Sequence, residues 1–454
     1  MLFSTNENSN NQESLETVDL SQVQLVYQTQ FFKGLANGGN VSGAFSLIGE
    51  SAVYGSAAVF TNQLLILGSR TFHALLLRSW TERLDHLVKE GKHRQAIALG
   101  LEMYDDPGRS LVGLRGSRDR KRAHIALRLM GVLKQFLGVC LTTEFPEEGG
   151  IGTLTRYFNE IVPPCIDVCV RLDKTDFLFD RVWNTFNADP FSLAAFLEHL
   201  EPYILSDQLV TVPTGIVQRF VEHYEKREKL VELEACITHL SIACLDLHQT
   251  MQVCERHDLF DAIIYIHNTA MLDYITPAER ILAKLAAAIG SGGRGQPLEE
   301  NLIELGNKLL VYISGCLAGR AYPFGDIPRQ QVKQVKYDIF STVTLISSRS
   351  AVADAAHTGG EAAAVHDELP YPHLHTLLHF NAQAFFNVLS IAFEEAEYQT
   401  EIGHSQKQRL VNILVQVGIC DNIYLDKALT RRLGRIFMQL MYNLYPSSLL
   451  ARML

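Results

Sequence analysis

One stretch of the sequence, residues 246–289, constrains the fold more than any other. Apolar residues at helical spacing predict a helix over residues 246–257 with a single apolar stripe. Residues 258–271 carry apolar side chains on two faces, which predicts an inner helix with neighbours on both sides. Thr-Pro-Ala-Glu at residues 276–279 then offers an N-cap hydroxyl, a proline at the first helical position and a capping glutamate. An outer helix, an inner helix and an immediate restart form one unit of a stacked helical array.

The composition permits such an array and excludes one class of partner. A chain of 454 residues with 47% hydrophobic residues can bury a large core, as two or three domains or as one extended array. The formal net charge is −10, whereas a protein that binds polyanions needs a concentrated positive surface. We therefore expect no nucleic acid among the partners.

The cysteines and the N-terminus indicate the compartment. No pair of the eight cysteines has Cys-x-x-Cys spacing, and most lie among apolar neighbours, as reduced core thiols do. Residues 1–19 are rich in Asn, Ser and Glu and lack the basic start and apolar run of a signal peptide, so we expect a disordered tail. No uninterrupted apolar run reaches the roughly 20 residues that span a bilayer. We expect a cytoplasmic protein whose membrane association is peripheral.

Residues 20–78 follow a pattern different from the rest of the chain. Apolar and polar residues alternate around residues 23–27, residues 71–77 are β-prone, and glycines punctuate the segment. About four short strands are expected, which is marginal for an independent domain, so we interpret the segment as the remnant of a larger β-domain. The capping box Ser79-Trp80-Thr81-Glu82 marks the change to helices, which we expect over residues 79–454.

Helical spacing predicts further helices along the rest of the chain. They are expected at residues 121–140, 154–172, 190–200, 213–224, 229–238, 298–317, 330–346, 373–397, 406–417 and 425–444. Pro163-Pro164 should kink or split the second of these, and Asp189-Pro190 should cap the third. Residues 91–99 echo residues 257–265 through a shared Ala-Ile pair, which is a weak sign of a repeat.

Loops and the C-terminus complete the expected organisation. Mobile loops are expected near residues 290–297, which are rich in glycine, and 347–368, which are rich in Ala, Gly, Ser and His. The chain is still apolar at Met453 and Leu454, without the polar cap that a free array end needs. We therefore expect the polypeptide to stop inside its array.

A search for catalytic motifs finds no seed for an enzyme. The glycines near residues 34–43 lack the Gly-Lys-Ser/Thr ending of a P-loop, and residues 49–53 lack the last glycine of a nucleophile elbow. His373, His375 and His379 are the best candidates for a zinc cluster, but histidines on a helix surface or in polar packing explain the spacing better. We predict no catalytic residue, no metal and no cofactor.

One dense basic run stands at the start of a predicted helix. It consists of Arg118, Arg120, Lys121 and Arg122, with Arg115 before them. These side chains could contact an anionic lipid or an acidic partner. A solvated loop is the simpler interpretation of the same residues.

Four longer stretches resemble one known family. They are FLEHLEPYILSDQLV at 196–210, FDAIIYIHNTAMLDYITPAER at 260–280, GNKLLVYISGCLAGRAYPFGDIP at 306–328 and LPYPHLHTLLHFNAQAFFNVLSIAFE at 369–394. They look like the vacuolar protein sorting-associated protein 8 family. The resemblance implies a WD40-type propeller, then a clathrin-heavy-chain-like α-solenoid of stacked helical hairpins, then a RING finger. It also implies contact with an early-endosomal Rab GTPase and with the class C Vps subunits of the CORVET tethering complex.

The chain departs from that pattern at both ends. Residues 20–78 correspond only to the end of a propeller, and no RING array of Cys and His follows the helices. We therefore expect an internal fragment of the family's architecture.

Together these patterns predict a mainly α, non-catalytic scaffold of an endosomal vesicle tether, peripheral on the early endosome membrane. Partner contact is predicted at Arg320, Tyr322, Phe324 and Asp326, because an arginine, two aromatics and an acid in one loop make good interface anchors. Buried packing of this loop is the alternative for the residues. A self-assembling membrane coat with clathrin-type repeats is the alternative function.

Overall fold

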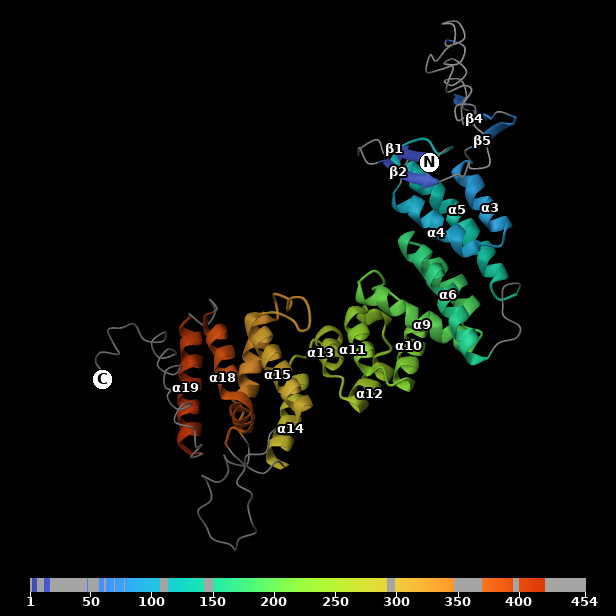
Figure 1. Cartoon of the computed structure of the whole chain (residues 1–454). Coiled ribbons are helices and arrows are strands. Elements are labelled where there is room, and N and C mark those ends of the chain that lie inside the picture. Colours follow the sequence, from blue (N-terminus) through green and yellow to red (C-terminus); the bar gives the residue numbers. More distant parts are fainter. Residues whose placement is uncertain are drawn as a thin grey trace, which may run out of the picture. The chain divides into compact units, whose positions relative to one another are not determined.

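The computed structural model describes residues 2–5, 12–16, 47, 57–60, 63–68, 70–76, 78–106, 113–142, 150–291, 299–346, 370–394 and 400–420. The chain divides into two compact units, Met1–Leu200 and Glu201–Leu454, and the boundary falls inside helix α9 (Pro190–Leu205). Within each unit the described residues are mainly helical, and consecutive helices pack against each other (Figure 1). The predicted fold class, helical hairpins preceded by a small β segment, is confirmed.

Several expectations concern residues outside this description. They are the alternating pattern at residues 23–27, most of the loop at 290–297, the loop at 347–368, and the helix at 425–444 with the apolar C-terminus.

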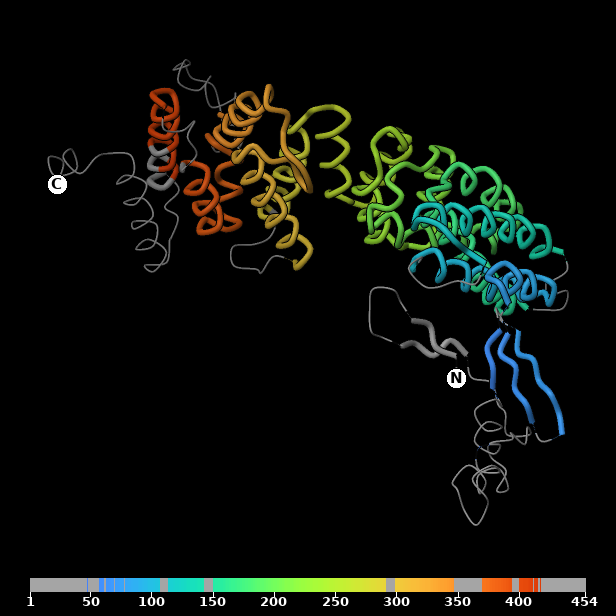
Figure 2. Tube along the Cα trace, turned by 90° about the horizontal axis from the view of Figure 1, so that it is seen from above, coloured from blue at the N-terminus to red at the C-terminus, as the bar shows by residue number. Residues whose placement is uncertain are grey.

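A three-stranded antiparallel sheet precedes the helices. It consists of β3 (Ala57–Phe60), β4 (Gln63–Leu67) and β5 (Phe72–Leu76), which lie side by side as blue strands in Figure 2. Val59 lies opposite Leu64, and Leu65 lies opposite Ala74. The β-prone stretch at residues 71–77 therefore contains a strand, as predicted.

The first residues differ from the expected disordered tail. Strand β1 (Leu2–Thr5) pairs antiparallel with β2 (Gln12–Glu16), with Phe3 opposite Ser14. A hairpin forms through backbone N–H and C=O groups, which a polar composition leaves available. Composition favoured disorder here because it reports side-chain burial and not backbone pairing.

Unit 1 builds its helical core between Trp80 and Leu200. Its helices are α3 (Trp80–Lys89), α4 (His93–Asp105), α5 (Arg118–Val139), α6 (Ile151–Arg171), α7 (Thr175–Phe177) and α8 (Trp183–Phe186), with a π-helical turn at Leu178–Val182. Gly100 of α4 allows a close approach of α5, because a Cβ at this position would lie 2.4 Å from Leu129 Cδ2. Leu129 and Phe136 of α5 are completely buried. The α4–α5 contact is therefore a main part of the unit 1 core.

Two predicted helix starts are confirmed in unit 1. Ser79 and Glu82 form the predicted capping box: Glu82 N donates to Ser79 Oγ at 3.3 Å, and Ser79 N donates to Glu82 Oε2 at 2.8 Å. At the start of α9, Asp189 Oδ2 accepts hydrogen bonds from the amides of Phe191 and Ser192, both at 2.9 Å. Both carboxylates satisfy amides that have no partner inside the helix.

The expected break at Pro163-Pro164 is wrong as a split, because α6 continues through both prolines. Prolines at these positions remove the N–H donors that would bond to the carbonyls of Asn159 and Glu160. Both of these residues are exposed, so water can satisfy the two carbonyls. The exposed face of α6 therefore tolerates two consecutive prolines, which a fully buried helix would not tolerate.

Unit 2 continues the same alternation of helices. Its helices are α10 (Thr214–Lys226), α11 (Leu230–His239), α12 (Leu247–His257), α13 (Phe260–Ile266), α14 (Thr276–Ser291), α15 (Glu300–Ala318), α16 (Val332–Val343), α18 (Pro372–Glu394) and α19 (Glu401–Cys420). A kink at Asn381, with φ of −160°, interrupts α18. The helices from α11 to α16 position the candidate site described below.

The inner helix predicted over residues 258–271 is confirmed in its first half. In α13, Ala262, Ile263, Ile264 and Ile266 are all buried. The helix then widens into a π-helical turn, η4 (His267–Met271), which ends with Met271 half-exposed. The predicted second apolar face therefore stops one turn early.

The neighbouring helices correct two details. On α12 the buried side chains are Thr250, Val253 and Cys254, whereas Leu247, an apolar residue at helical spacing from Cys254, is 37% exposed. Helix α14 begins at Thr276, and the capping carboxylate belongs to Asp273, which precedes the predicted cap. Residue spacing located the apolar stripe of α12 and the cap of α14 to within one helical turn. It did not identify which side chains are buried in α12 or which side chain caps α14.

One type of turn recurs between consecutive helices. Its first residue has a left-handed backbone, with φ of +72° at Gly91, +53° at Asp173, +56° at Glu228 and +59° at Asp258. The next residue donates its N–H to a carbonyl five residues earlier: Lys92 to Leu87, Lys174 to Cys169, Lys229 to Tyr224 and Leu259 to Cys254. These are Schellman turns, which end one helix as the next begins.

The weak echo between residues 91–99 and 257–265 has a structural basis in this turn. In both places the turn leads into a buried Ala-Ile pair, Ala96-Ile97 in α4 and Ala262-Ile263 in α13. The small alanine permits close helix packing while the isoleucine fills the core.

The left-handed residues predict opposite effects of two substitutions. Glu228→Gly should raise the free energy of unfolding by about 0.5–1 kcal/mol, because glycine adopts this backbone without strain. Gly91→Ala should lower it by about 1 kcal/mol, since open space surrounds Gly91 and the added Cβ meets only backbone strain. Urea unfolding followed by circular dichroism measures both. Equal effects of the same sign would contradict the assignment of the turn.

Candidate partner-binding surface

The loop between α15 and α16 is a closed turn of the backbone. Gly319, with φ of +80°, ends α15. Arg320 then pairs with Asp326 across the loop, Ala321 N donates to Gly325 O at 3.1 Å, and Ile327 N donates to Gly319 O at 3.1 Å. The backbone hydrogen bonds therefore hold residues 319–327 in one compact shape.

Tyr322 anchors this loop to the inner helix. Its hydroxyl donates to Asp261 Oδ1 at 2.8 Å, and its carbonyl accepts a hydrogen bond of 3.3 Å from Asn268 Nδ2. Its ring lies edge-on to that of Tyr312, with centroids 6.2 Å apart. Burial, together with the charge of Asp261, raises the pKa of the Tyr322 hydroxyl, so this group stays a donor.

Asp261 connects four elements. Its amide donates to Glu234 Oε1 of α11 at 2.7 Å, its Oδ2 lies 2.9 Å from Lys308 Nζ of α15, and its Oδ1 accepts the Tyr322 hydroxyl. Burial raises the pKa of Glu234, and the charge of Asp261 adds to that effect. Burial alone would lower the pKa of Lys308, but the hydrogen bond and charge of Asp261 outweigh it and leave the pKa raised. The lysine therefore stays charged and balances the two acids.

A second buried polar group lies on the other side of the anchor. The hydroxyl of Tyr312, a completely buried residue of α15, lies 2.8 Å from the carbonyl of Tyr274 and 3.0 Å from Asn268 Oδ1. Asn268 is also buried, and its amide nitrogen bonds to Tyr322. The π-helical turn η4, helix α15 and the loop are thus joined by one chain of hydrogen bonds.

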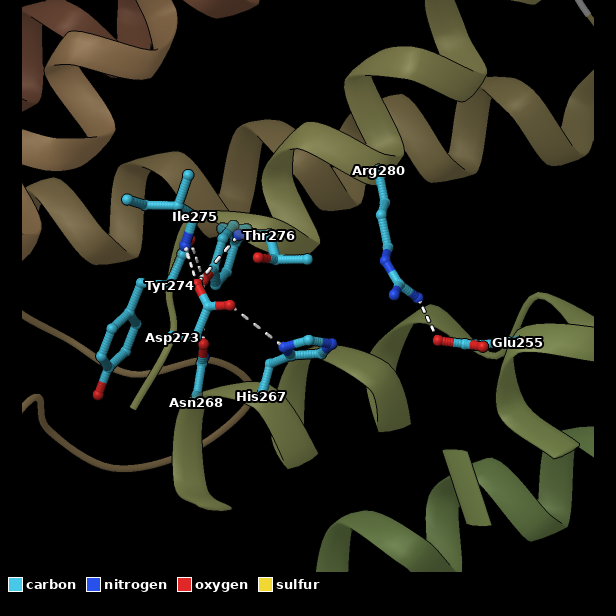
Figure 3. Close-up of polar contacts among 9 residues, drawn as sticks. Glu255, His267, Asn268, Asp273, Tyr274, Ile275, Thr276 and Arg280 are labelled. Carbon is cyan, nitrogen blue, oxygen red and sulfur yellow. Dashed lines mark hydrogen bonds and ion pairs between the residues drawn. The ribbon is translucent and has the colours of Figure 1, made fainter. Parts of the chain in front are cut away.

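Figure 3 shows how the same turn leads into α14. Asp273 Oδ1 accepts the amides of Ile275 at 3.0 Å and Thr276 at 3.1 Å, and its Oδ2 lies 3.5 Å from His267 Nδ1. Burial would raise the pKa of Asp273, but hydrogen bonds from Thr276 and Ile275 outweigh it and lower the pKa. Burial lowers the pKa of His267 more than the nearby Asp273 raises it. His267 is therefore neutral at pH 7.

The outward side of the loop differs from its anchor. Arg320, Phe324 and Asp326 are exposed, and Phe324 keeps 65% of its surface accessible. The Phe324 ring lies 5.5 Å from the ring of His239, the last residue of α11. His239 Nδ1 in turn lies 2.8 Å from Asp207 Oδ1. The loop thus contacts the end of α11, and the end of α11 contacts the connection after α9.

Contacts link these connections to one another, and we call the surface that they form the loop edge. Ser241 N donates to Val210 O at 2.9 Å, and this joins the α9–α10 connection to the one after α11. Exposed apolar side chains recur along it: Leu205, Val210, Leu247, Met271, Leu272 and Phe324. Because helices α9, α11, α13 with η4, and α15 all end here, their C-terminal connections share one edge of unit 2.

The predicted contact residues therefore separate into two roles. Arg320, Phe324 and Asp326 lie on the loop edge and are accessible, whereas Tyr322 turns inward and holds the loop. Buried packing, the alternative to partner contact for these residues, thus applies to Tyr322. Sequence reasoning missed Met271 and Leu272, because their exposure depends on where η4 ends.

The predicted basic run is also divided by the structure. Arg118 and Arg120 are exposed in the first turn of α5. Arg122 is half-buried: its Nε donates to Tyr104 O at 3.3 Å, and its guanidinium lies 5.5 Å from the centre of the Tyr104 ring. Lys121 is half-buried as well. Accessible charge is therefore concentrated on Arg118 and Arg120.

The candidate zinc histidines take part in helix packing. His375 and His379 stack with ring centroids 6.5 Å apart, and His373 Nδ1 lies 2.8 Å from Thr342 O. Within the described ranges, no group of three or more His, Cys, Asp or Glu side chains is arranged to hold a metal ion. Among the same residues, no helix combines the length and apolar character needed to cross a membrane.

Comparison with known proteins covers both parts of the chain. Residues 195–393, which include the loop edge, match the model for the Vps8 central TPR, and residues 5–75 match the model for the Vps8 beta-propeller. The human vacuolar protein sorting-associated protein 8 homolog is 37% identical over 408 residues, which is 90% of this chain. The chain belongs to the Vps8 family. The helical array and the preceding strands thus correspond to two Vps8 domains.

Other Vps8 relatives extend the comparison. The mouse homolog is 36% identical and the Drosophila melanogaster homolog 33% identical, each over 408 residues. The chain spans 27% of the human and mouse proteins and 29% of the Drosophila protein.

We predict that removal of the buried Tyr312 hydroxyl lowers the stability of the chain. Tyr312→Phe should lower the free energy of unfolding by about 1–3 kcal/mol, because it removes the one buried hydroxyl that lies within hydrogen-bond distance of both the Tyr274 carbonyl and Asn268 Oδ1. Tyr337→Phe is the matched control, since Tyr337 is 55% exposed and should change it by less than about 0.5 kcal/mol. Urea unfolding measures the free energy of unfolding of both variants. Similar small effects would show that the Tyr312 hydroxyl does not stabilise the turn.

The lowered pKa of His267 predicts a dependence of stability on pH. The unfolded chain binds a proton at this residue near pH 6.5 but the folded chain does so only at lower pH, so the free energy of unfolding should fall as the pH drops below about 6.5. His267→Gln should flatten this fall between pH 7.5 and pH 5.5, and His199, whose pKa burial also lowers, should retain part of it. His124→Gln, at an exposed position, is the control for the loss of one imidazole. Urea midpoints at the two pH values provide the measurement.

Proposed function

We propose that this chain acts as a non-catalytic scaffold in an endosomal vesicle-tethering complex of the CORVET type, in protein transport to the endosome, lysosome or vacuole. The observation that carries the proposal is the Vps8 match over residues 195–393, because it includes the helices that build the loop edge. In this proposal the chain works by binding class C Vps subunits and an early-endosomal Rab GTPase. It associates peripherally with the early endosome membrane.

The loop edge is the proposed docking surface for a class C Vps subunit. Exposed apolar residues that recur along one edge are typical of protein–protein contact surfaces. Arg320 and Phe324 are residue types that often carry binding energy. The Tyr322 anchor and the backbone hydrogen bonds order the loop before a partner arrives, so little conformational entropy remains to be lost on binding.

Substitution of Phe324 tests the docking surface. Phe324→Asp should reduce the recovery of co-purified class C Vps subunits at least about tenfold, because it places a charge where an apolar contact is proposed. Val231→Asp is the matched control: Val231 is 78% exposed on α11 but lies at the start of that helix, away from the loop edge. Quantitative affinity purification from cells gives the measurement, with circular dichroism to confirm folding.

Two further outcomes sharpen this experiment. Equal recovery of the subunits by Phe324→Asp and by the unchanged chain would remove the loop edge as their docking surface. Concentration-dependent self-assembly of the purified chain, without recovery of other subunits, would favour a membrane coat over a tether.

A further inference from the structure

Unit 1 carries an exposed basic surface that the loop edge does not explain. It consists of Arg78, Arg115, Arg118 and Arg120, all of which are exposed, and we call it the arginine patch. The four residues come from two connections and from the start of α5. They stand out in a chain whose formal net charge is −10.

Close approaches of the backbone bring the parts of the arginine patch together. Gly113 lies against the start of α3, since a Cβ on Gly113 would lie 3.2 Å from Ser79 Cβ. The segment that carries Arg115 therefore passes beside Arg78, which precedes Ser79. Further along, a Cβ on Gly116 would lie 3.7 Å from Cβ and Cδ of Arg120, so the Arg120 side chain extends over this glycine. These contacts place the segment of Arg78 beside the segment that carries the other three arginines, although the two are far apart in sequence.

Nearby acids compensate only part of this charge. Glu82 faces Arg78 and lies in the Ser79 capping box, where hydrogen bonds from the Ser79 amide and hydroxyl, followed by the charge of Arg78, lower its pKa. Asp119 is the acid in the first turn of α5. Lys121 and Arg122 lie directly behind the patch on α5. The four arginines of the patch thus stand beside one acid in the first turn of each helix, Glu82 in α3 and Asp119 in α5.

An exposed leucine continues the same face of α5. Leu127 lies seven residues after Arg120, which is two helical turns, and 76% of its surface is accessible. A basic surface with an accessible apolar side chain matches the two attractions of a peripheral membrane protein. The cations are drawn to anionic headgroups, and the apolar group enters the headgroup boundary.

We propose that the arginine patch docks onto an anionic membrane surface. This inference rests on the proposed function, because a vesicle tether works beside such a surface. Exposed arginines from separate segments suit a plane that offers many phosphates. An acidic protein segment is the competing partner, and the experiment below distinguishes it.

Vesicle flotation tests this proposal with the purified chain. The chain should bind phosphatidylcholine vesicles that contain phosphatidylserine, bind pure phosphatidylcholine vesicles weakly, and lose binding as salt increases. Arg118→Glu with Arg120→Glu should raise the lipid concentration for half-maximal binding about 10- to 30-fold, since each lost basic residue weakens binding by roughly fivefold. Leu127→Ala should raise it by a smaller factor. Glutamate in the first turn of a helix is favourable, so the double variant should stay folded.

A second pair of substitutions controls for net charge. Arg156→Glu with Arg181→Glu makes the same change in charge at exposed positions outside the patch and should keep vesicle binding. Equal binding by the two double variants, or equal binding to neutral and anionic vesicles, would overturn the proposal. Binding to polyglutamate with no binding to vesicles would assign the patch to an acidic protein. Recovery of class C Vps subunits should remain unchanged in Arg118→Glu with Arg120→Glu, so this test and the Phe324 test can fail separately.

Discussion

The architecture of unit 2 depends on how Asp261 holds the inner helix. An inner helix must bury two faces, and in α13 this leaves the amides of its first turn and a carboxylate in partly buried surroundings. Glu234 accepts a hydrogen bond from the amide of Asp261, and Lys308 and Tyr322 contact the carboxylate of Asp261. Each partner comes from a different element. The interaction that removes the penalty of burying α13 therefore also fixes α11, α15 and the loop around it.

The Schellman turns explain why a binding surface arises on this scaffold. Each turn reverses the chain within two residues, so consecutive helices become antiparallel and alternate helices end on the same side. In unit 2 the turns at Glu228 and Asp258 are tight, whereas the connections that follow α9, α11 and α15 are longer. Longer connections have room for side chains that face outward, such as Phe324 and Leu272. The loop edge is thus a consequence of unequal connection lengths in a regular helical array.

Unit 1 and unit 2 present surfaces of different chemistry. In unit 2 the exposed groups of the loop edge are mainly apolar and suit a protein partner. In unit 1 the arginine patch is cationic and suits an anionic surface. A scaffold that holds a protein and a membrane needs both kinds of attraction, and neither requires a catalytic group. The Vps8 family membership and the two surfaces therefore both support the proposal that the chain is a non-catalytic scaffold.

The sequence by itself determined the helical array, the capping box at Ser79, the Asp189 cap and the inner character of α13. These features depend on residues close together in the chain, so spacing and capping chemistry report them. Only the tertiary structure decided that Asp273 caps α14, that α6 continues through two prolines, and that Tyr322 turns inward while Phe324 stays exposed. Each of these outcomes depends on neighbours distant in sequence or on which face meets water. A single sequence carries the period of a helix but not the identity of the side chains packed against it.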